Sequence, residues 1–208
     1  MGLVRLAFRR SFAMLERYAD EWAAANARAL SGQGPLWVVL GDSAAQAVGA
    51  SSYDNGWVGV VHRRLGPHWR VLNLSESGAR TRNAVDVQWP AARALDATLV
   101  TAVVGGNDAM HTKEARWLRD ADNLIEVLPV GAVVSTVARG VFERKTARVN
   151  EHLRMAAAAK GLHVADIWAH TGPPYRGLYF DGLHPNDKGY LQWADAVWAA
   201  LPDSVRSG

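Results

Sequence analysis

The chain has 208 residues, of which 49% are hydrophobic and 21% charged, a composition typical of one soluble globular domain with a sizeable core. The net charge of +3, with no basic run interleaved with aromatics, argues against a nucleic-acid partner. The absence of cysteine excludes disulfides, a thiol nucleophile and cysteine-ligated metals, and no apolar stretch reaches the roughly 20 residues that a membrane span needs.

Residues 1–30 are predicted to form an extra amphipathic helix at the front of a single domain that covers 1–208. Its apolar side chains recur at helical spacing, at Val4, Phe8, Phe12, Leu15 and Trp22. Arginines interrupt the apolar residues, so the segment lacks the continuous core and the cleavage site of a signal peptide. We expect a cytoplasmic protein whose first helix packs on the domain. The alternatives are a peripheral membrane contact or an oligomer contact through this helix.

Five apolar segments, typical of buried strands, alternate with helical patterns along the rest of the chain. The strands are predicted at 36–40, 69–74, 98–104, 132–137 and 162–165. The helices are predicted from 43 onward and at 56–65, 80–95 with a bend near Pro90, 113–128, 144–160 and 187–201, and residues 203–208 are expected to be frayed. This alternation predicts a three-layer α/β/α sandwich with a five-stranded parallel sheet.

Short polar motifs follow the first three predicted strands, and a fourth motif precedes the last helix. They are Gly41-Asp42-Ser43, Ser77-Gly78, Gly105-Gly106-Asn107-Asp108 and Asp181-Gly182-Leu183-His184. In open parallel sheets, ligands bind beyond the carboxyl ends of the strands. We therefore expect the four motifs to meet at one rim of the sheet.

The residue types in these motifs indicate acyl transfer, and most simply ester hydrolysis. Ser43 is the candidate nucleophile, His184 the base that takes its proton, and Asp181 the carboxylate that orients the imidazole. The candidate oxyanion donors are the backbone N–H groups of Ser43 and Gly78 and the side-chain amide of Asn107. This chemistry requires no metal and no organic cofactor.

In this order, the four motifs resemble those of the SGNH (GDSL-type) hydrolase family, which is named for Ser, Gly, Asn and His. The resemblance runs from about residue 36 to the end and implies a serine esterase or lipase with a flavodoxin-like α/β fold. It implies Ser43 as nucleophile, Gly78 and Asn107 in the oxyanion hole, and the pair Asp181 and His184. The chain departs from the family at Ser75-Glu76, where many members carry a glycine-containing stretch, and in lacking a leucine after Ser43. Both departures affect the expected shape of the pocket and leave the predicted catalytic residues unchanged.

The same residues also have structural interpretations. Ser43 could cap a helix, His184 could be an ordinary loop residue, and Asp42 and Asp108 are interpreted as scaffold residues. The six other histidines show no metal-ligand spacing. The four motifs together favour catalysis over a silent binding module of the same fold. A dinucleotide site is excluded because no Gly-x-Gly-x-x-Gly motif follows the first strand.

The substrate expected from the sequence is a carboxylic ester with a small or moderate acyl group, carried on a small molecule, a glycan or a lipid. A carbohydrate O-deacetylase, a short-chain thioesterase and an acyltransferase on the same site remain alternatives. Arg80 and Arg139 follow the second and fourth predicted strands. If their side chains reach the site, they would favour an acidic or phosphorylated substrate.

Overall fold

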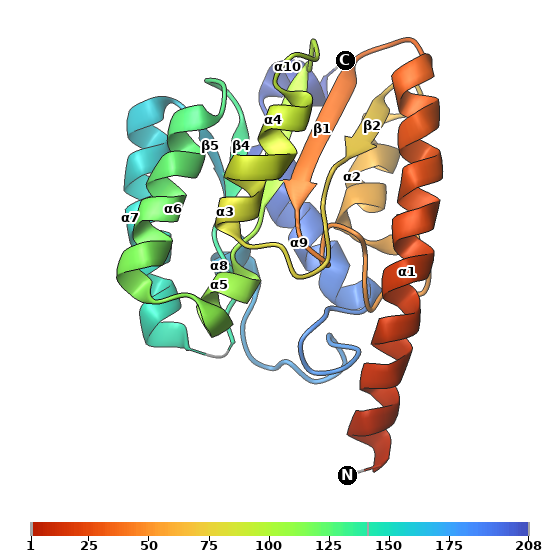
Figure 1. Ribbon diagram of the computed structural model, residues 1–208, viewed down its shortest axis with the longest axis vertical. Helices are drawn as coiled ribbons and strands as arrows, with labels where there is room; N and C mark the ends of the chain where they lie inside the picture. The colour runs from red at the N-terminus through yellow and green to blue at the C-terminus, as the bar shows by residue number, and fades with distance from the viewer. Residues whose placement is uncertain (1, 141, 208) are drawn as a thin grey trace.

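A single parallel sheet organises the molecule (Figure 1). The computed structural model describes residues 2–140 and 142–207, with side chains from Ser11 onward. The five strands lie in the order β2-β1-β3-β4-β5. They are β1 (Leu36–Gly41), β2 (Arg70–Asn73), β3 (Leu99–Val103), β4 (Val133–Ser135) and β5 (His163–Ala165). This doubly wound order confirms the predicted fold class and creates a rim at the carboxyl ends of the central strands.

Each face of the sheet has its own apolar core, because successive strand residues point to opposite sides. Trp37 and Val39 of β1 belong to one core, and Val38 and Leu40 belong to the other. The first core is completed by α1 (Gly2–Ser31), α2 (Trp57–Leu65) and α9 (Asp187–Ala200). The second is completed by the helical run after β2 and by α6 (Glu114–Val127) and α7 (Glu143–Lys160). The sandwich therefore has three layers.

The helix predicted directly after Ser43 is wrong: residues 43–49 form consecutive turns. The Asp42 side chain accepts the N–H of Ala44 at 3.0 Å, and Ala47 adopts a left-handed φ of 71° that no right-handed helix tolerates. Ala47 also packs so close to Gly56 that a Cβ on the glycine would lie 2.3 Å from it. The small residues of this segment thus serve close packing instead of helix formation.

The helical run after β2 contains the predicted bend in the form of a π-helical turn. It consists of α3 (Thr81–Asn83), the π-turn η2 (Ala84–Gln88) and α4 (Trp89–Ala92), with Pro90 just beyond the turn. A proline ring displaces the backbone of the preceding turn and removes one donor. The π-turn points Gln88 at the end of β1, where its side chain bonds both the N–H and the C=O of Gly41 at 2.8 Å.

Four short elements were not predicted from the sequence: η1 (Tyr53–Asn55), α5 (Gly106–His111), α8 (Ile167–His170) and α10 (Asp203–Arg206). The expectation of a frayed C-terminus is wrong for α10. Val205 is buried there and joins the first core, so one apolar contact holds the segment against the domain.

Helix α1 packs against the domain along a face that differs from the predicted one. The buried positions are Ser11, Tyr18, Trp22 and Ala29, whereas Phe12 is 68% exposed. Val4 and Phe8 lie outside the described side chains. Within the described residues, no helix combines the length and apolar character needed to cross a membrane. Helical spacing in the sequence therefore predicted the helix and the burial of Trp22, but not which face of the helix packs against the domain.

Candidate active site

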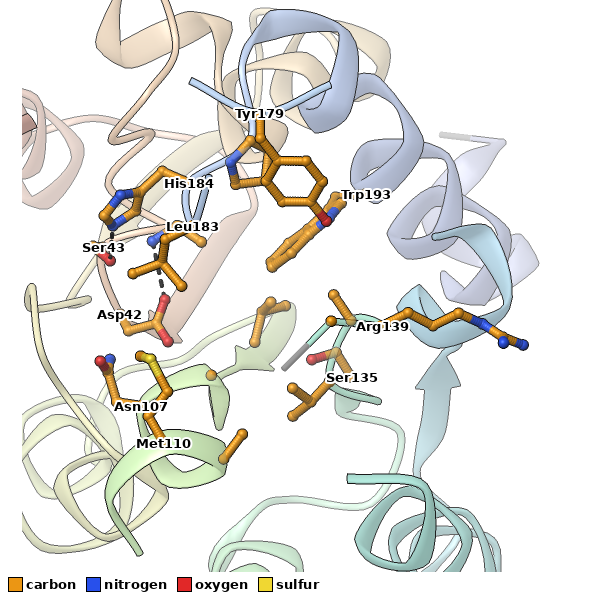
Figure 2. A pocket seen from close by; sticks show the side chains of 18 of the residues that line it. Asp42, Ser43, Asn107, Met110, Ser135, Arg139, Tyr179, Leu183, His184 and Trp193 are labelled. Atoms are coloured by element: carbon orange, nitrogen blue, oxygen red, sulfur yellow. Dashed lines mark hydrogen bonds between the residues drawn. The ribbon is translucent and has the colours of Figure 1, made fainter. Parts of the chain in front are cut away.

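Three of the predicted site residues line one cavity of about 460 Å³ at the carboxyl rim of the sheet: Ser43, Asn107 and His184 (Figure 2). Ser43 follows β1, Asn107 lies on α5 directly after β3, and His184 precedes α9. Residues that are up to 141 positions apart in the chain therefore meet, as expected from motifs placed at strand ends.

Ser43, His184 and Asp181 form a continuous chain of hydrogen-bonding groups. The Ser43 hydroxyl lies 3.0 Å from Nε2 of His184, and Nδ1 of the same ring lies 2.7 Å from a carboxylate oxygen of Asp181. A carboxylate facing Nδ1 favours the tautomer with the proton on that nitrogen, and in this tautomer Nε2 is an acceptor for the serine proton. This is the arrangement that activates a serine hydroxyl.

The loop at residues 181–184, here called the Asp–His loop, is built by its own backbone. Oδ1 of Asp181 accepts the N–H groups of Leu183 at 2.9 Å and His184 at 2.8 Å, which closes an Asx-type turn. The N–H of Phe180 donates to the carbonyl of His184 at 2.8 Å. The spacing of three residues thus places the carboxylate and the imidazole on one tight turn.

The Asp181 side chain is fully buried and receives a fourth hydrogen bond from outside its loop. The Ser11 hydroxyl on α1 donates to Oδ2 at 2.6 Å, the same oxygen that faces His184. Burial alone would raise the pKa of Asp181, but the hydrogen bonds from His184 and Ser11 outweigh it and hold the pKa well below its ordinary value. Sequence reasoning missed Ser11, because a lone serine on a helix carries no motif.

The predicted oxyanion donors lie around Ser43 but do not all line the same cavity. The Asn107 amide donates one proton to the carbonyl of Ala79 at 2.9 Å, which fixes the amide plane and leaves its second N–H for a ligand. Gly78 has a left-handed φ of 83°, a conformation that favours glycine. Gly78 is among the residues that border a neighbouring cavity and not among those that line the first.

Close backbone packing brings the loop after β1 against the Asp–His loop. A Cβ on Gly49 would lie 2.4 Å from the carbonyl oxygen of Pro185, so this contact requires glycine. The left-handed φ of 97° at Gly49 makes the same demand. The hydroxyl of Tyr190 on α9 donates to the carbonyl of Val48 at 2.6 Å. These contacts hold Ser43 and His184 at a fixed separation.

Two polar side chains tie the motifs together. Gln46 donates to the carbonyl of Ser75 at 3.0 Å and accepts from the Ser77 hydroxyl at 2.5 Å, linking the serine motif to the glycine motif. Asp108 is fully buried and accepts the N–H and hydroxyl of Thr81, at 2.7 and 2.9 Å. Asp108 therefore supports the site from behind and is not among the residues that line the cavity. Gln46 carried no signal in the sequence.

Asp42 is a buried carboxylate on the wall of the cavity beside Ser43. One oxygen accepts the N–H of Ala44, as described above, and burial raises the pKa of the group to about 6. The arrangement matches the scaffold interpretation of Asp42: its hydrogen bond shapes the turn that presents Ser43.

The two arginines considered for anionic substrates do not converge on Ser43. The guanidinium of Arg139 lies 4.7 Å from the ring centroid of Trp168 and donates to the Trp168 carbonyl, and Figure 2 shows it directed away from the cavity. Arg80 borders the neighbouring cavity beside Gly78. Among the described side chains, no cluster of three or more histidine or acidic groups is arranged to hold a metal ion.

A doubly wound sheet with a Ser–His–Asp chain at its carboxyl rim places the protein among the α/β serine hydrolases. A model of the GDSL-like Lipase/Acylhydrolase family matches residues 39–191, so the chain belongs to this family. It is an SGNH-type carboxylic ester hydrolase. The matched region includes all four motifs but not α1, which ends at Ser31.

Solved structures with the same fold include an esterase, a lipase and TesA, all of low sequence identity. An acetylxylan esterase, Axe2 from Geobacillus stearothermophilus, is 18% identical with a TM-score of 0.68, covering 83% of this chain and 98% of that chain. TesA is 22% identical with a TM-score of 0.67, covering 82% and 99%. The lipase Lip_vut3 from a goat rumen metagenome is 17% identical with a TM-score of 0.67, covering 80% and 97%. A search of the curated proteins gave no match.

Proposed function

We propose that this site hydrolyses carboxylic esters through an acyl-enzyme formed on Ser43. The observation that carries the proposal is the unbroken chain from the Ser43 hydroxyl through both nitrogens of His184 to the buried carboxylate of Asp181. As the serine oxygen attacks the ester carbonyl, Nε2 of His184 takes its proton. The imidazolium then gives that proton to the departing alkoxide, which leaves as the alcohol and yields the acyl-enzyme.

Water completes the cycle by the same route. His184 takes a proton from water as the water oxygen attacks the acyl carbonyl, and then returns a proton to the Ser43 oxygen as the acid leaves. Asp181 stays ionised and stabilises the imidazolium in both halves. In each tetrahedral intermediate we assign stabilisation of the negative oxygen to the N–H group of Ser43 and the amide of Asn107, which line the cavity, whereas Gly78 borders the neighbouring one.

The wall of the cavity favours an acyl group of moderate length. Apolar side chains from β3, α5 and α9 and from the loops after β3, after β4 and before α9 line it: Val103, Val104, Met110, Val137, Leu183 and Trp193. Its volume of about 460 Å³ falls within the roughly 300–1,000 Å³ range of small-molecule sites and far exceeds the needs of an acetyl group. An apolar chain buried here gains hydrophobic free energy with each methylene.

The alternative functions differ in what occupies this cavity and what attacks the acyl-enzyme. An O-deacetylase, such as the similarly folded acetylxylan esterase, needs no room for a longer acyl chain. A thioesterase would use the same acyl cavity with a thiolate as the leaving group. An acyltransferase would need an alcohol to outcompete water. The cavity volume therefore favours an esterase or thioesterase over a deacetylase.

Hydrolysis of 4-nitrophenyl esters from acetate to dodecanoate tests this function. We expect kcat/KM to rise with chain length and pass through a maximum at an intermediate length, and the Ser43→Ala variant to lose at least about a thousandfold in kcat. Ser31→Ala is the control, because the exposed Ser31 hydroxyl bonds carbonyls of α1 and is not among the residues that line the cavity, and this variant should retain activity. Substantial hydrolysis by Ser43→Ala would refute the mechanism.

Covalent labelling provides an independent test of the nucleophile. A fluorophosphonate probe should modify wild-type enzyme and Ser31→Ala at Ser43, as read by peptide mass spectrometry, and should leave Ser43→Ala unmodified. Modification at another serine would contradict the assignment even if Ser43→Ala were inactive.

A further inference from the structure

Helix α1 reaches the reaction centre although it lies outside the region matched by the family model. The hydroxyl of Ser11 donates to Oδ2 of Asp181 at 2.6 Å across 170 positions of sequence. Ser11 is 4% exposed and the Asp181 side chain is fully buried, so water does not compete for this bond. The contact therefore joins the first helix to the carboxylate that orients His184.

The four donors to Asp181 are not equivalent. Two backbone N–H groups of the Asp–His loop bind Oδ1, whereas Nδ1 of His184 and the Ser11 hydroxyl share Oδ2. Three of these donors belong to the loop itself, and Ser11 is the donor from a separate element. The serine thus restrains the oxygen that faces the imidazole and draws negative charge from it.

Other contacts of α1 attach the helix to the opposite side of the site. The hydroxyl of Tyr18 donates to the carbonyl of Ala50 at 2.9 Å, and the indole N–H of Trp22 donates to the carbonyl of Gln46 at 3.3 Å. Both acceptors lie in the turns that follow Ser43. One face of α1 therefore spans the serine-bearing segment and the Asp–His loop.

We propose that Ser11 is a positioning residue of the active site, through which α1 sets the orientation and charge of the Asp181 carboxylate. The inference rests on the proposed role of Asp181 in the Ser–His–Asp mechanism. Loss of the hydroxyl removes one restraint on Oδ2 and concentrates its negative charge toward His184. The looser carboxylate orients the imidazole less well, while the higher charge stabilises the imidazolium.

Full-length Ser11→Ala and Tyr18→Phe variants test this role. Each loses one buried hydroxyl from the same helix face, but the Ser11 hydroxyl is the one that contacts the triad. We expect Ser11→Ala to lower kcat roughly 3- to 30-fold with little change in KM, and to move the acidic limb of the kcat/KM profile to higher pH. Tyr18→Phe should keep the wild-type kcat and pH profile. Ser11→Thr, which keeps a hydroxyl at this position, should also have a kcat and pH profile close to those of wild type.

A spectroscopic readout separates positioning from simple loss of stability. The downfield proton resonance of the His184 Nδ1–H should shift in Ser11→Ala and stay unchanged in Tyr18→Phe. A Ser11→Ala enzyme with wild-type kcat, pH profile and resonance would overturn the inference, as would equal changes in Tyr18→Phe. If Ser43→Ala retained hydrolysis, the proposed function itself would fail. That outcome differs from a Ser11→Ala substitution that has no effect in an enzyme whose activity still depends on Ser43.

Discussion

Asp42 and Asp181 are buried carboxylates at the same rim, and their surroundings displace their pKa values in opposite directions. Burial raises the pKa of Asp42 to about 6, and the hydrogen bond that its carboxylate accepts from the Ala44 N–H does not offset this. Asp181 is also buried, but four donors hold its pKa well below the ordinary value. The number of hydrogen-bond donors therefore distinguishes the two groups: Asp181 has enough donors to keep its pKa low despite burial, whereas Asp42 does not.

Replacement of Asp42 by asparagine should stabilise the protein at neutral and alkaline pH. A raised folded-state pKa means that the contribution of Asp42 to stability is present below its unfolded pKa and is lost as pH rises through about 6. Relative to Asp42→Asn, wild type should lose about 2 kcal/mol of unfolding free energy between pH 4.5 and pH 8. Asparagine keeps an oxygen for the Ala44 N–H.

Urea unfolding followed at both pH values measures this difference. Asp96→Asn, which removes an exposed carboxylate, is the control and should track wild type. A constant gap between Asp42→Asn and wild type across this range would show that Asp42 is not destabilised by ionisation. The low pKa of Asp181 acts in the reverse sense: its contribution is present at neutral pH and fades in acid.

At the scale of elements, α1 closes an edge of the sheet. The side chain of Asn26 donates to the carbonyl of Asn73 at 2.7 Å and accepts its N–H at 2.8 Å, so it bonds β2 as a neighbouring strand would. Exposed strand edges are prone to pair with other chains. The helix therefore protects β2 while it carries Ser11 to the site.

Asn26→Ala should destabilise the fold, because it leaves both backbone groups of Asn73 without this partner. We expect a loss of about 1–3 kcal/mol in unfolding free energy, seen as a lower urea midpoint with an unchanged slope. Ser31→Ala is the control on the same helix: its exposed hydroxyl bonds only carbonyls within α1, and its effect should be close to zero. Equal midpoints for the two variants would contradict this role of Asn26.

At the scale of the whole molecule, the cavity is assembled from distant parts of the chain. Figure 2 places Ser43, His184 and Asn107 on one side of it and Ser135 and Arg139 on the other. Trp193 of α9 also lines the wall and packs edge-on to Tyr190 at 6.1 Å between ring centroids. In the proposed reaction, the acyl group would therefore be bounded by the ends of β3 and β4 and by α9.

Trp193→Ala should enlarge the cavity and shift the preferred 4-nitrophenyl ester to a longer acyl chain. The enlarged cavity can bury methylenes of a longer acyl chain that do not fit in the wild-type cavity. Each methylene buried in this way contributes up to about 0.8 kcal/mol of binding free energy, so the preferred chain becomes longer. Trp198→Ala removes a partly buried indole from the same helix away from the cavity. If the chain-length profiles of both variants match wild type, Trp193 does not bound the acyl group.

The strands and the four motifs could be predicted because each rests on a local pattern. An apolar run such as 99–103 and a helix-ending glycine such as Gly161 are recognisable within a few residues. The segment after Ser43 misled the helix prediction, because Ala47 packs against Gly56 and Gly49 against Pro185, and no local pattern encodes these contacts. The docking face of α1 was missed for the same reason.

Local chemistry in the chain therefore identifies the three-layer fold, the order of the four motifs and the residue types that an acyl-transfer site needs. Folding adds what depends on distance in space: the Ser11 bond to Asp181, the tie between motifs through Gln46, and the size of the acyl cavity. The physical reason is that these contacts join segments tens to more than a hundred residues apart. A single hydroxyl or amide at such a separation leaves no periodicity or spacing for a sequence pattern to reveal.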